Sequence, residues 1–194
     1  MIARIRKLMQ ESMETKNHFL TEYNLKAVSG ISDLMIDSLQ KGGKILSCGN
    51  GGSASDSLHF TAELLGRFQT DRPSIAAICL NADISTMTAI SNDMGFDRIF
   101  SRQVDALGKE GDVLFVLSTS GNSANLREAV KSAKKKDVCS IGLLGRDGGE
   151  LKNLLDASVI VDSQKSARIQ EVHITLIHIL CEIIEDYFYT KKTP

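Results

Sequence analysis

Residues 44–68 read KILSCGNGGSASDSLHFTAELLGRF and contain, in order, a short apolar run, a loop rich in glycine and serine, and a helical pattern of apolar residues. The run at 44–49 has the length and β-prone composition of a buried strand. Gly49, Gly51 and Gly52 permit the tight turn that leads from the strand into the helix. A strand followed by a helix in this way is the repeating unit of α/β folds.

The same unit recurs to the end of the chain. Further apolar runs lie at 75–80, 112–118, 139–145 and 157–162, and helical patterns lie at 85–90, 99–111, 123–137, 149–155 and 169–189. Strands that alternate with helices imply βαβ crossovers, because parallel neighbours cannot be joined by a two-residue turn. The sequence therefore predicts an α/β fold with a five-stranded parallel sheet and helices on both faces.

Two long helices are predicted before the first strand. One runs from Ile2 to about Tyr23, and the second ends at the glycine pair Gly42–Gly43, where a helix C-cap is expected. Two helices are more than one sheet needs as cover, so residues 1–42 are interpreted as an oligomerisation arm, with a simple packing role as the alternative. There is no linker, and the prediction is a single domain over 1–194, with the sheet and closing helix in 43–194.

The composition excludes several classes of function. The 23 basic and 24 acidic residues nearly cancel, which argues against a global electrostatic grip on nucleic acid or on an anionic membrane. No apolar stretch approaches the ~18–20 residues that span a bilayer, and the N-terminus does not resemble a secretory signal. The four cysteines are far apart within apolar runs, as buried thiols of a reducing compartment would be. We expect a soluble, cytoplasmic chain.

Two loops stand where open α/β sheets bind their ligands, at the carboxyl ends of strands. The first is CGNGGSAS (48–55) and the second is LSTSGNSAN (117–125). Backbone N–H groups at a helix N-terminus, together with several hydroxyls, can bind phosphate. Either loop alone is equally consistent with a capped turn, but two of them favour a phosphorylated ligand. Neither contains GxGxxG or GxxxxGK[ST], so no nucleotide cofactor is expected.

Polar pairs interrupt the apolar faces of two predicted helices. His59 and Glu63 are four residues apart, and therefore share one face of the helix that follows the first loop. Gln170 and His178 share a stripe on the closing helix, and His173 lies about a third of a turn away from it. Convergence of these groups would suit general acid/base chemistry or a divalent metal, and composition does not choose between them.

With these residues in view, the chain resembles the phosphoheptose isomerase family of the sugar isomerase (SIS) domain proteins. The matching stretches are CGNGGSASDSLHFTAELLGRF, RPSIAAI, AISNDMGFDRIFSRQV, GDVLFVLSTSGNSANL and ARIQEVHITLIHILCEIIE. The resemblance implies a flavodoxin-like three-layer sandwich, assembled as a homotetramer with active sites at subunit interfaces. It also implies conversion of sedoheptulose 7-phosphate to D-glycero-D-manno-heptose 7-phosphate through an enediolate. This is the first step of ADP-heptose biosynthesis for lipopolysaccharide core or other surface glycans.

The resemblance also implies roles for particular positions. The catalytic pair falls on Glu63 and His178. Phosphate contacts fall on Ser118, Thr119, Ser120 and Ser123, and the other substrate contacts on Asn50, Gly51, Gly52, Ser53, Glu63, Asn92, Asp93 and Gln170. Zinc, one ion per subunit, would be held by His59, Glu63, Gln170 and His178. Some members of the family have an aspartate where this chain has Ala167, so a substrate contact from that aspartate is either absent here or supplied elsewhere, with Ser166 as the nearest polar candidate.

Two other functions share this fold. One is a non-enzymatic relative that binds the bacterial replication initiator protein, which the segments RPSIAAICLNAD and SARIQE resemble. The other is a sugar-phosphate sensor, which usually carries an attached DNA-binding module. A binding scaffold has no use for Glu63 and His178 in one pocket, so the presence of both favours the enzyme.

Overall fold

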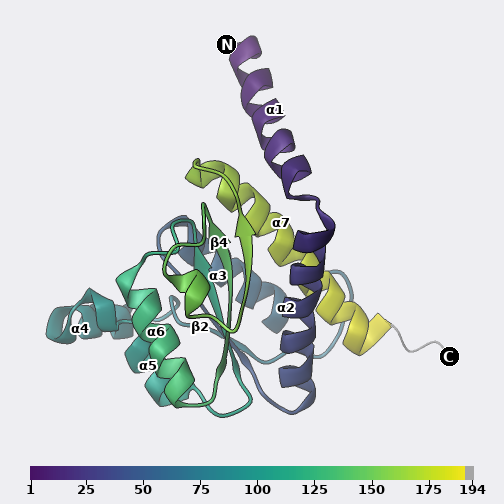
Figure 1. The fold of residues 1–194 in the computed structure, drawn as a ribbon. Coiled ribbons are helices and arrows are strands. Elements are labelled where there is room, and N and C mark those ends of the chain that lie inside the picture. The colour runs from purple at the N-terminus through teal and green to yellow at the C-terminus, as the bar shows by residue number, and fades with distance from the viewer. Residues whose placement is uncertain (191–194) are drawn as a thin grey trace.

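The structure, a computed structural model, describes residues 1–190 and has a five-stranded, all-parallel sheet at its centre (Figure 1). The strands are β1 (Ile45–Gly49), β2 (Ala77–Cys79), β3 (Val113–Ser118), β4 (Cys139–Gly145) and β5 (Ala157–Val161). Their order across the sheet is β2-β1-β3-β4-β5, with every neighbouring pair parallel. The five predicted strands and the flavodoxin-like architecture are confirmed.

Helices flank the sheet in the predicted order. They are α1 (Ile2–Phe19), α2 (Glu22–Gln40), α3 (Gly52–Leu65), α4 (Ile84–Met94), α5 (Ser101–Leu107), α6 (Ala124–Lys135) and α7 (Ser166–Glu185), with short 3₁₀ turns η1 (Phe96–Arg98) and η2 (Leu151–Asn153) and a π-helical turn η3 (Asp186–Thr190). The predicted helix at 149–155 was wrong, because only the 3₁₀ turn η2 forms there. Gly149 has a φ of +53°, and a segment this short cannot offset the cost of nucleating an α-helix.

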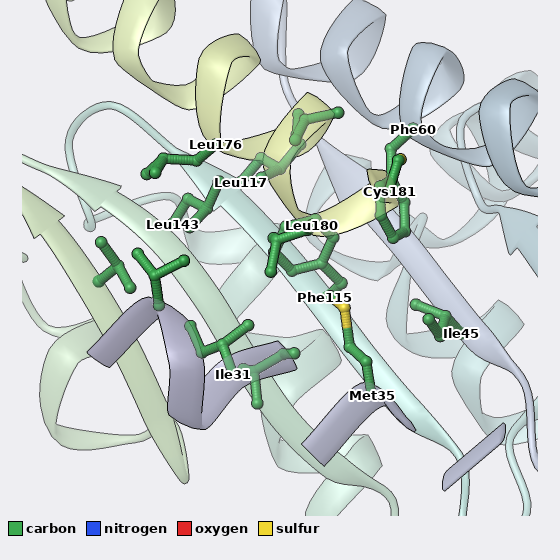
Figure 2. Packing of buried hydrophobic residues seen from close by; sticks show 14 of the residues in the cluster. Ile31, Met35, Ile45, Phe60, Phe115, Leu117, Leu143, Leu176, Leu180 and Cys181 are labelled. Carbon is green, nitrogen blue, oxygen red and sulfur yellow. The ribbon is translucent and has the colours of Figure 1, made fainter. Parts of the chain in front are cut away.

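Two hydrophobic clusters, one on each face of the sheet, make the three layers. Helices α2, α3 and α7 cover one face, where Phe60 packs edge-on against Phe115 with the ring centroids 5.0 Å apart (Figure 2). Helices α5 and α6 cover the other face, with Phe100 and Leu126 fully buried between them and the strands. Since α3 and α7 lie in the same layer, side chains from both helices can meet at their contact.

The strand order brings the two predicted ligand loops together. β1 lies between β2 and β3, so the crossovers that leave β1 and β3 run in opposite directions across the sheet. A crevice therefore opens between the carboxyl ends of these two strands. Gly49 and Leu117 are partners in the register of β1 and β3, which places both loops at the same edge of the sheet.

Helix α1 extends away from the sandwich (Figure 1). Apart from Phe19, which is buried, its apolar side chains face solvent in the single chain, with Ile5 54% and Met9 61% exposed. The middle of the helix is tied to the start of α7, because Arg168 Nη1 donates to the carbonyl oxygen of Leu8 at 2.6 Å and Lys165, the N-cap of α7, pairs with Glu11. The two predicted N-terminal helices are confirmed, and the first of them leaves an uncovered apolar stripe.

The cysteines behave largely as predicted. All four are free, Cys48, Cys79 and Cys181 are buried, and Cys139 is half-buried. Burial raises the pKa of Cys181 to about 12, with the carboxylate of Glu63 adding to the effect. These thiols are therefore protonated at neutral pH. Within residues 1–190, no helix has both the length and the apolar character needed to cross a bilayer.

Candidate active site

The loop after β1 is held in a tight conformation that starts α3 immediately. Gly51 has a φ of +57°, and a Cβ on Gly49 would lie 2.5 Å from the backbone oxygen of Ser53. The side chain of Asn81 brackets Gly49, accepting from its N–H at 3.1 Å and donating to its carbonyl at 2.9 Å. The loop therefore requires glycine, and its conformation is set before any ligand arrives.

The loop after β3 has the features of a phosphate cradle. Ser118 Oγ accepts from the N–H of Gly121 at 3.0 Å, and Ser120 Oγ accepts from the N–H of Asn122 at 3.2 Å. Ser123 is the N-cap of α6, yet its side chain makes no capping hydrogen bond. Its hydroxyl and the first N–H groups of α6 can therefore donate hydrogen bonds to a bound anion, which the helix dipole also favours.

A neighbouring loop supports this cradle, and the sequence reasoning missed it. Gly121 O accepts from the N–H of Leu151 at 2.9 Å, and Asn122 Oδ1 accepts from the N–H of Glu150 at 3.0 Å. A Cβ on Gly121 would lie 2.0 Å from the carbonyl oxygen of Gly148. The sequence did contain a signal for this loop, the glycine pair at 148–149, which is typical of a tight turn. In the structure both glycines have positive φ.

A reciprocal amide pair joins the two ligand loops. Asn50 Nδ2 donates to Asn125 Oδ1, and Asn125 Nδ2 donates to Asn50 Oδ1, both at 2.9 Å. Asn125 is 2% exposed and also accepts from the N–H of Leu126. Asn125 was not predicted as a site residue. Its pairing means that the amide of Asn50, predicted as a sugar contact, is already hydrogen-bonded within the protein.

Helices α3 and α7 bring His59, Glu63 and His178 together. His59 Nε2 lies 3.0 Å from Glu63 Oε1 and 3.2 Å from His178 Nε2. The side chains of His59 and Glu63 are 44% and 24% exposed, so a ligand can reach them. The ring of Phe68 stacks on His178, with centroids 5.8 Å apart and planes 28° apart. The predicted convergence of the two helices is present for these three residues.

Three other residues that were predicted to contact substrate or metal, Gln170, Asn92 and Asp93, lie outside this cluster. The amide of Gln170, two turns before His178 on α7, lies against Gly52, since a Cβ there would be 2.4 Å from Gln170 Nε2. Asn92 and Asp93 are exposed at the end of α4, where Asn92 Nδ2 donates to Asp93 Oδ1 at 2.7 Å. Figure 1 shows α4 at the periphery, away from α7. A single chain does not gather these two residues with His178.

The donor set of the cluster suits a divalent metal. His59, Glu63 and His178 each offer one ligand atom, and the three atoms lie within 4.8 Å of one another. Two imidazole nitrogens and a carboxylate oxygen are ligands that zinc accepts, and ligand atoms of a tetrahedral zinc site stand roughly 3.3 Å apart. The observed separations of 3.0 and 3.2 Å are close to that value. The three residues therefore fit zinc.

His173 is a core residue and lies outside the cluster. It is fully buried, and its Nε2 lies 3.2 Å from the carbonyl oxygen of Leu144. Burial lowers its pKa to about 4, with the hydrogen bond to Leu144 opposing the change. Closer to the cluster, burial raises the pKa of Asp56, while the nearby His59 partly opposes this rise.

The family pattern of the SIS domain matches residues 9–145, so the parallel sheet with its paired loops is that of a SIS-domain protein. A phosphoheptose isomerase of Helicobacter pylori is 53% identical over 159 residues, which are 82% of this chain and 83% of that relative. The structures of phosphoheptose isomerases from Neisseria gonorrhoeae (TM-score 0.89, 45% identity) and Francisella tularensis (TM-score 0.91, 38% identity) each match 95% of this chain and 98% of their own. The chain belongs to the phosphoheptose isomerase family.

Proposed function

We propose that Glu63 and His178 are the acid/base pair with which this enzyme isomerises sedoheptulose 7-phosphate to D-glycero-D-manno-heptose 7-phosphate. The substrate follows from membership of the phosphoheptose isomerase family, whose product feeds the biosynthesis of ADP-heptose. The observation that supports the roles is the cluster of His59, Glu63 and His178, which lies where α3, the helix that leaves the β1 loop, meets α7.

The reaction moves one proton between adjacent carbons, and each group has a place in that transfer. Glu63 takes the proton from C1 of the ketose and returns it to C2, while His178 moves a proton between the oxygens of C2 and C1. The intermediate is an enediolate, and no oxidant or reductant is consumed. His59 Nε2 lies 3.0 Å from Glu63 Oε1 and 3.2 Å from His178 Nε2, so His59 holds both side chains at one point of the contact between α3 and α7.

The two loops would hold the rest of the substrate. Ser118, Thr119, Ser120 and Ser123 bind the phosphate at the N-terminus of α6, and Gly51, Gly52 and Ser53 face the sugar hydroxyls. Binding energy from the distant phosphate then orients C1 and C2 against the acid/base pair. Because α4 lies at the periphery, Asn92 and Asp93 would contact substrate bound to a neighbouring subunit.

We further propose one zinc ion per subunit, held by His59, Glu63, Gln170 and His178, of which the first two and His178 are clustered in the structure. Where substrate replaces one of these four ligands, zinc would polarise the substrate carbonyl. Metal analysis of protein purified without chelator should find about one zinc per chain. Zinc should also raise the melting temperature of the stripped protein but not that of His59→Gln. A fully active preparation with almost no bound zinc would contradict the proposal that the enzyme needs this metal.

The assembly and location are proposals of the same kind. The uncovered apolar stripe of α1 supports an oligomerisation arm at residues 1–42 of a single domain, and a homotetramer with active sites at subunit interfaces. We expect the enzyme in the cytoplasm, where its phosphorylated substrate would be made, without a nucleic-acid or membrane partner. The alternative, binding of the replication initiator, is not favoured, because relatives at about half identity are named as isomerases.

The deciding experiment follows aldoheptose 7-phosphate by NMR after sedoheptulose 7-phosphate is mixed with the purified protein. The wild type should turn over, and Glu63→Gln should bind substrate but lose turnover by at least a hundredfold. Glu110→Gln, an exposed carboxylate at the opposite edge of the sheet, is the matched control and should keep full activity. Full activity in Glu63→Gln would mean that Glu63 is not the catalytic base.

A further inference from the structure

A buried ion pair ties together the ends of the two helices that carry the acid/base pair. Arg72 Nε donates to Glu185 Oε2 at 2.7 Å, and the two side chains are only 1% and 3% exposed. Arg72 follows α3 in the chain, and Glu185 is the last residue of α7. They are 113 residues apart in sequence, so this contact exists only in the folded chain.

Arg72 also completes the C-terminal end of α3. Its Nη2 donates to the carbonyl oxygen of Glu63 at 2.8 Å, and its Nη1 donates to that of Leu64 at 3.0 Å. The last carbonyls of a helix have no partner within the helix, and a cation there is favoured by the dipole. One planar guanidinium therefore holds the backbone of Glu63 itself, which lysine could not do in the same geometry.

Glu185 holds the loop that connects α3 to Arg72. Its carboxylate accepts from the backbone N–H groups of Phe68, Gln69 and Thr70 at 3.3, 3.0 and 2.8 Å. Burial alone would raise the pKa of Glu185, but Arg72 and the N–H groups of Thr70 and Gln69 lower it below its ordinary value. The carboxylate is therefore charged at neutral pH and fixes three consecutive residues.

The fixed loop carries the aromatic ring that stacks on His178. Phe68 is half-buried, and its ring lies nearly parallel to the imidazole at 5.8 Å. Stacking restricts rotation of the imidazole about its side-chain bonds. Without the stacked ring, ordering His178 for the reaction would cost conformational entropy. Glu185 therefore acts on His178 through Phe68, while Arg72 acts on Glu63 through its backbone.

We propose that Arg72, Glu185 and Phe68 form a positioning clamp that sets the geometry between Glu63 and His178, a role that rests on the proposed catalytic function of those two residues. A buried ion pair adds little net stability over apolar packing, because desolvation offsets the attraction. The pair instead fixes the position of α3 relative to α7, because it joins the ends of the two helices at one point.

The sharpest test uses Phe68, because a half-buried side chain can be changed without unfolding the chain. Phe68→Leu should lower kcat for sedoheptulose 7-phosphate about tenfold and leave KM within about twofold, since a small misplacement of reacting groups is costly. Phe68→Tyr keeps the ring and should keep kcat. In the ¹³C-histidine NMR spectrum, the His178 ring signals should shift in Phe68→Leu but not in Phe68→Tyr.

The ion pair needs a matched control for stability. Glu185→Gln and Arg72→Lys should lower kcat by about tenfold to a hundredfold. Asp112→Asn weakens another partly buried pair, with Lys44 at the amino edge of the sheet, and should lower the melting temperature without lowering kcat. Equal loss of kcat in Asp112→Asn and Glu185→Gln would mean that the clamp is only structural.

Failure of the clamp and failure of the proposed function give different results. If Phe68→Leu keeps wild-type kcat and an unmoved His178 signal while Glu63→Gln is inactive, the clamp is wrong and the catalytic base stands. If Glu63→Gln is active, the base assignment is wrong, and the NMR shift still reports whether Phe68 orients His178.

Discussion

Glu63 and His178 lie 115 residues apart in sequence and meet through His59, so the proposed chemistry depends on single side chains held by their neighbours. Local spacing predicted that His59 and Glu63 share a face of α3. The environment of each histidine then separates their roles, because His59 and His178 are open to a ligand while His173 is fully buried.

At the scale of one residue, His173 should make stability depend on pH. The folded chain holds this histidine neutral down to about pH 4, whereas an unfolded histidine protonates near pH 6.5. The unfolded state therefore binds more protons between these values, and the free energy of unfolding should fall by about 3 kcal/mol as pH drops from ~6.5 to ~4.

Urea unfolding at a series of pH values checks this prediction. His173→Leu should lose this part of the pH dependence, although it also leaves the carbonyl of Leu144 without its partner. His18→Gln, a change on the exposed surface of α1, should keep the wild-type profile. Parallel profiles for wild type and His173→Leu would contradict the prediction.

A second prediction at this scale concerns the phosphate cradle. Ser123→Ala removes a hydroxyl with no bond of its own to the helix, so the change should not damage α6. A hydrogen bond to a charged group is worth about 1.5–3 kcal/mol, so KM should rise roughly tenfold or more while kcat changes little. Steady-state kinetics would show this, with Ser132→Ala on the same helix as control. An unchanged KM would exclude Ser123 from the phosphate site.

At the scale of elements, the site is built from loops that require glycine for different reasons. Gly51 needs a positive φ, and Gly49 needs space against Ser53. Gly121 needs both, because its φ is +67° and the backbone of Gly148 lies against it. By contrast, Gly30 in α2 has an ordinary φ and open space around it, so nothing in its surroundings requires glycine.

This contrast predicts opposite effects of alanine. Gly121→Ala should destabilise the chain by more than about 2 kcal/mol, since backbone strain and a backbone clash add, and it should raise KM by displacing the phosphate cradle. Gly30→Ala should stabilise the chain by about 0.5–1 kcal/mol. Chemical denaturation of both variants measures the difference, and equal stabilities would contradict the loop packing described above.

At the scale of the whole molecule, the apolar stripe of α1 is the feature that one chain cannot cover. Ile5→Glu and Met9→Glu place charges on this stripe and should shift the protein to species of lower mass, which sedimentation would detect. If the active sites lie at subunit interfaces as proposed, activity should fall with the assembly, because each site would need residues of both partners. Lys7→Glu on the same helix, outside the stripe, is the control. An unchanged mass in both stripe variants would mean that α1 is not the arm.

Much of the fold was predictable because its signals are local. Each strand is a short apolar run, and each ligand loop is a cluster of glycine and serine directly after a strand. The 149–155 segment was predicted wrongly since its apolar spacing fits a helix while its glycine favours a turn. The resemblance assigned Asn50 to the sugar, whereas nothing in local spacing predicted that its amide pairs with Asn125, 75 residues away.

The sequence by itself determined the five strands, the two ligand loops, the shared face of His59 and Glu63, and the family. The strands, the loops and the shared face follow from side-chain periodicity and turn chemistry, which act over a few residues, whereas the family follows from a resemblance along much of the chain. Only the tertiary structure decided that the loops of β1 and β3 are neighbours, that Gln170 lies against Gly52, and that Arg72 meets Glu185. Such contacts depend on how helices and strands pack, because the partners are brought together by burial of the whole core rather than by their spacing along the chain.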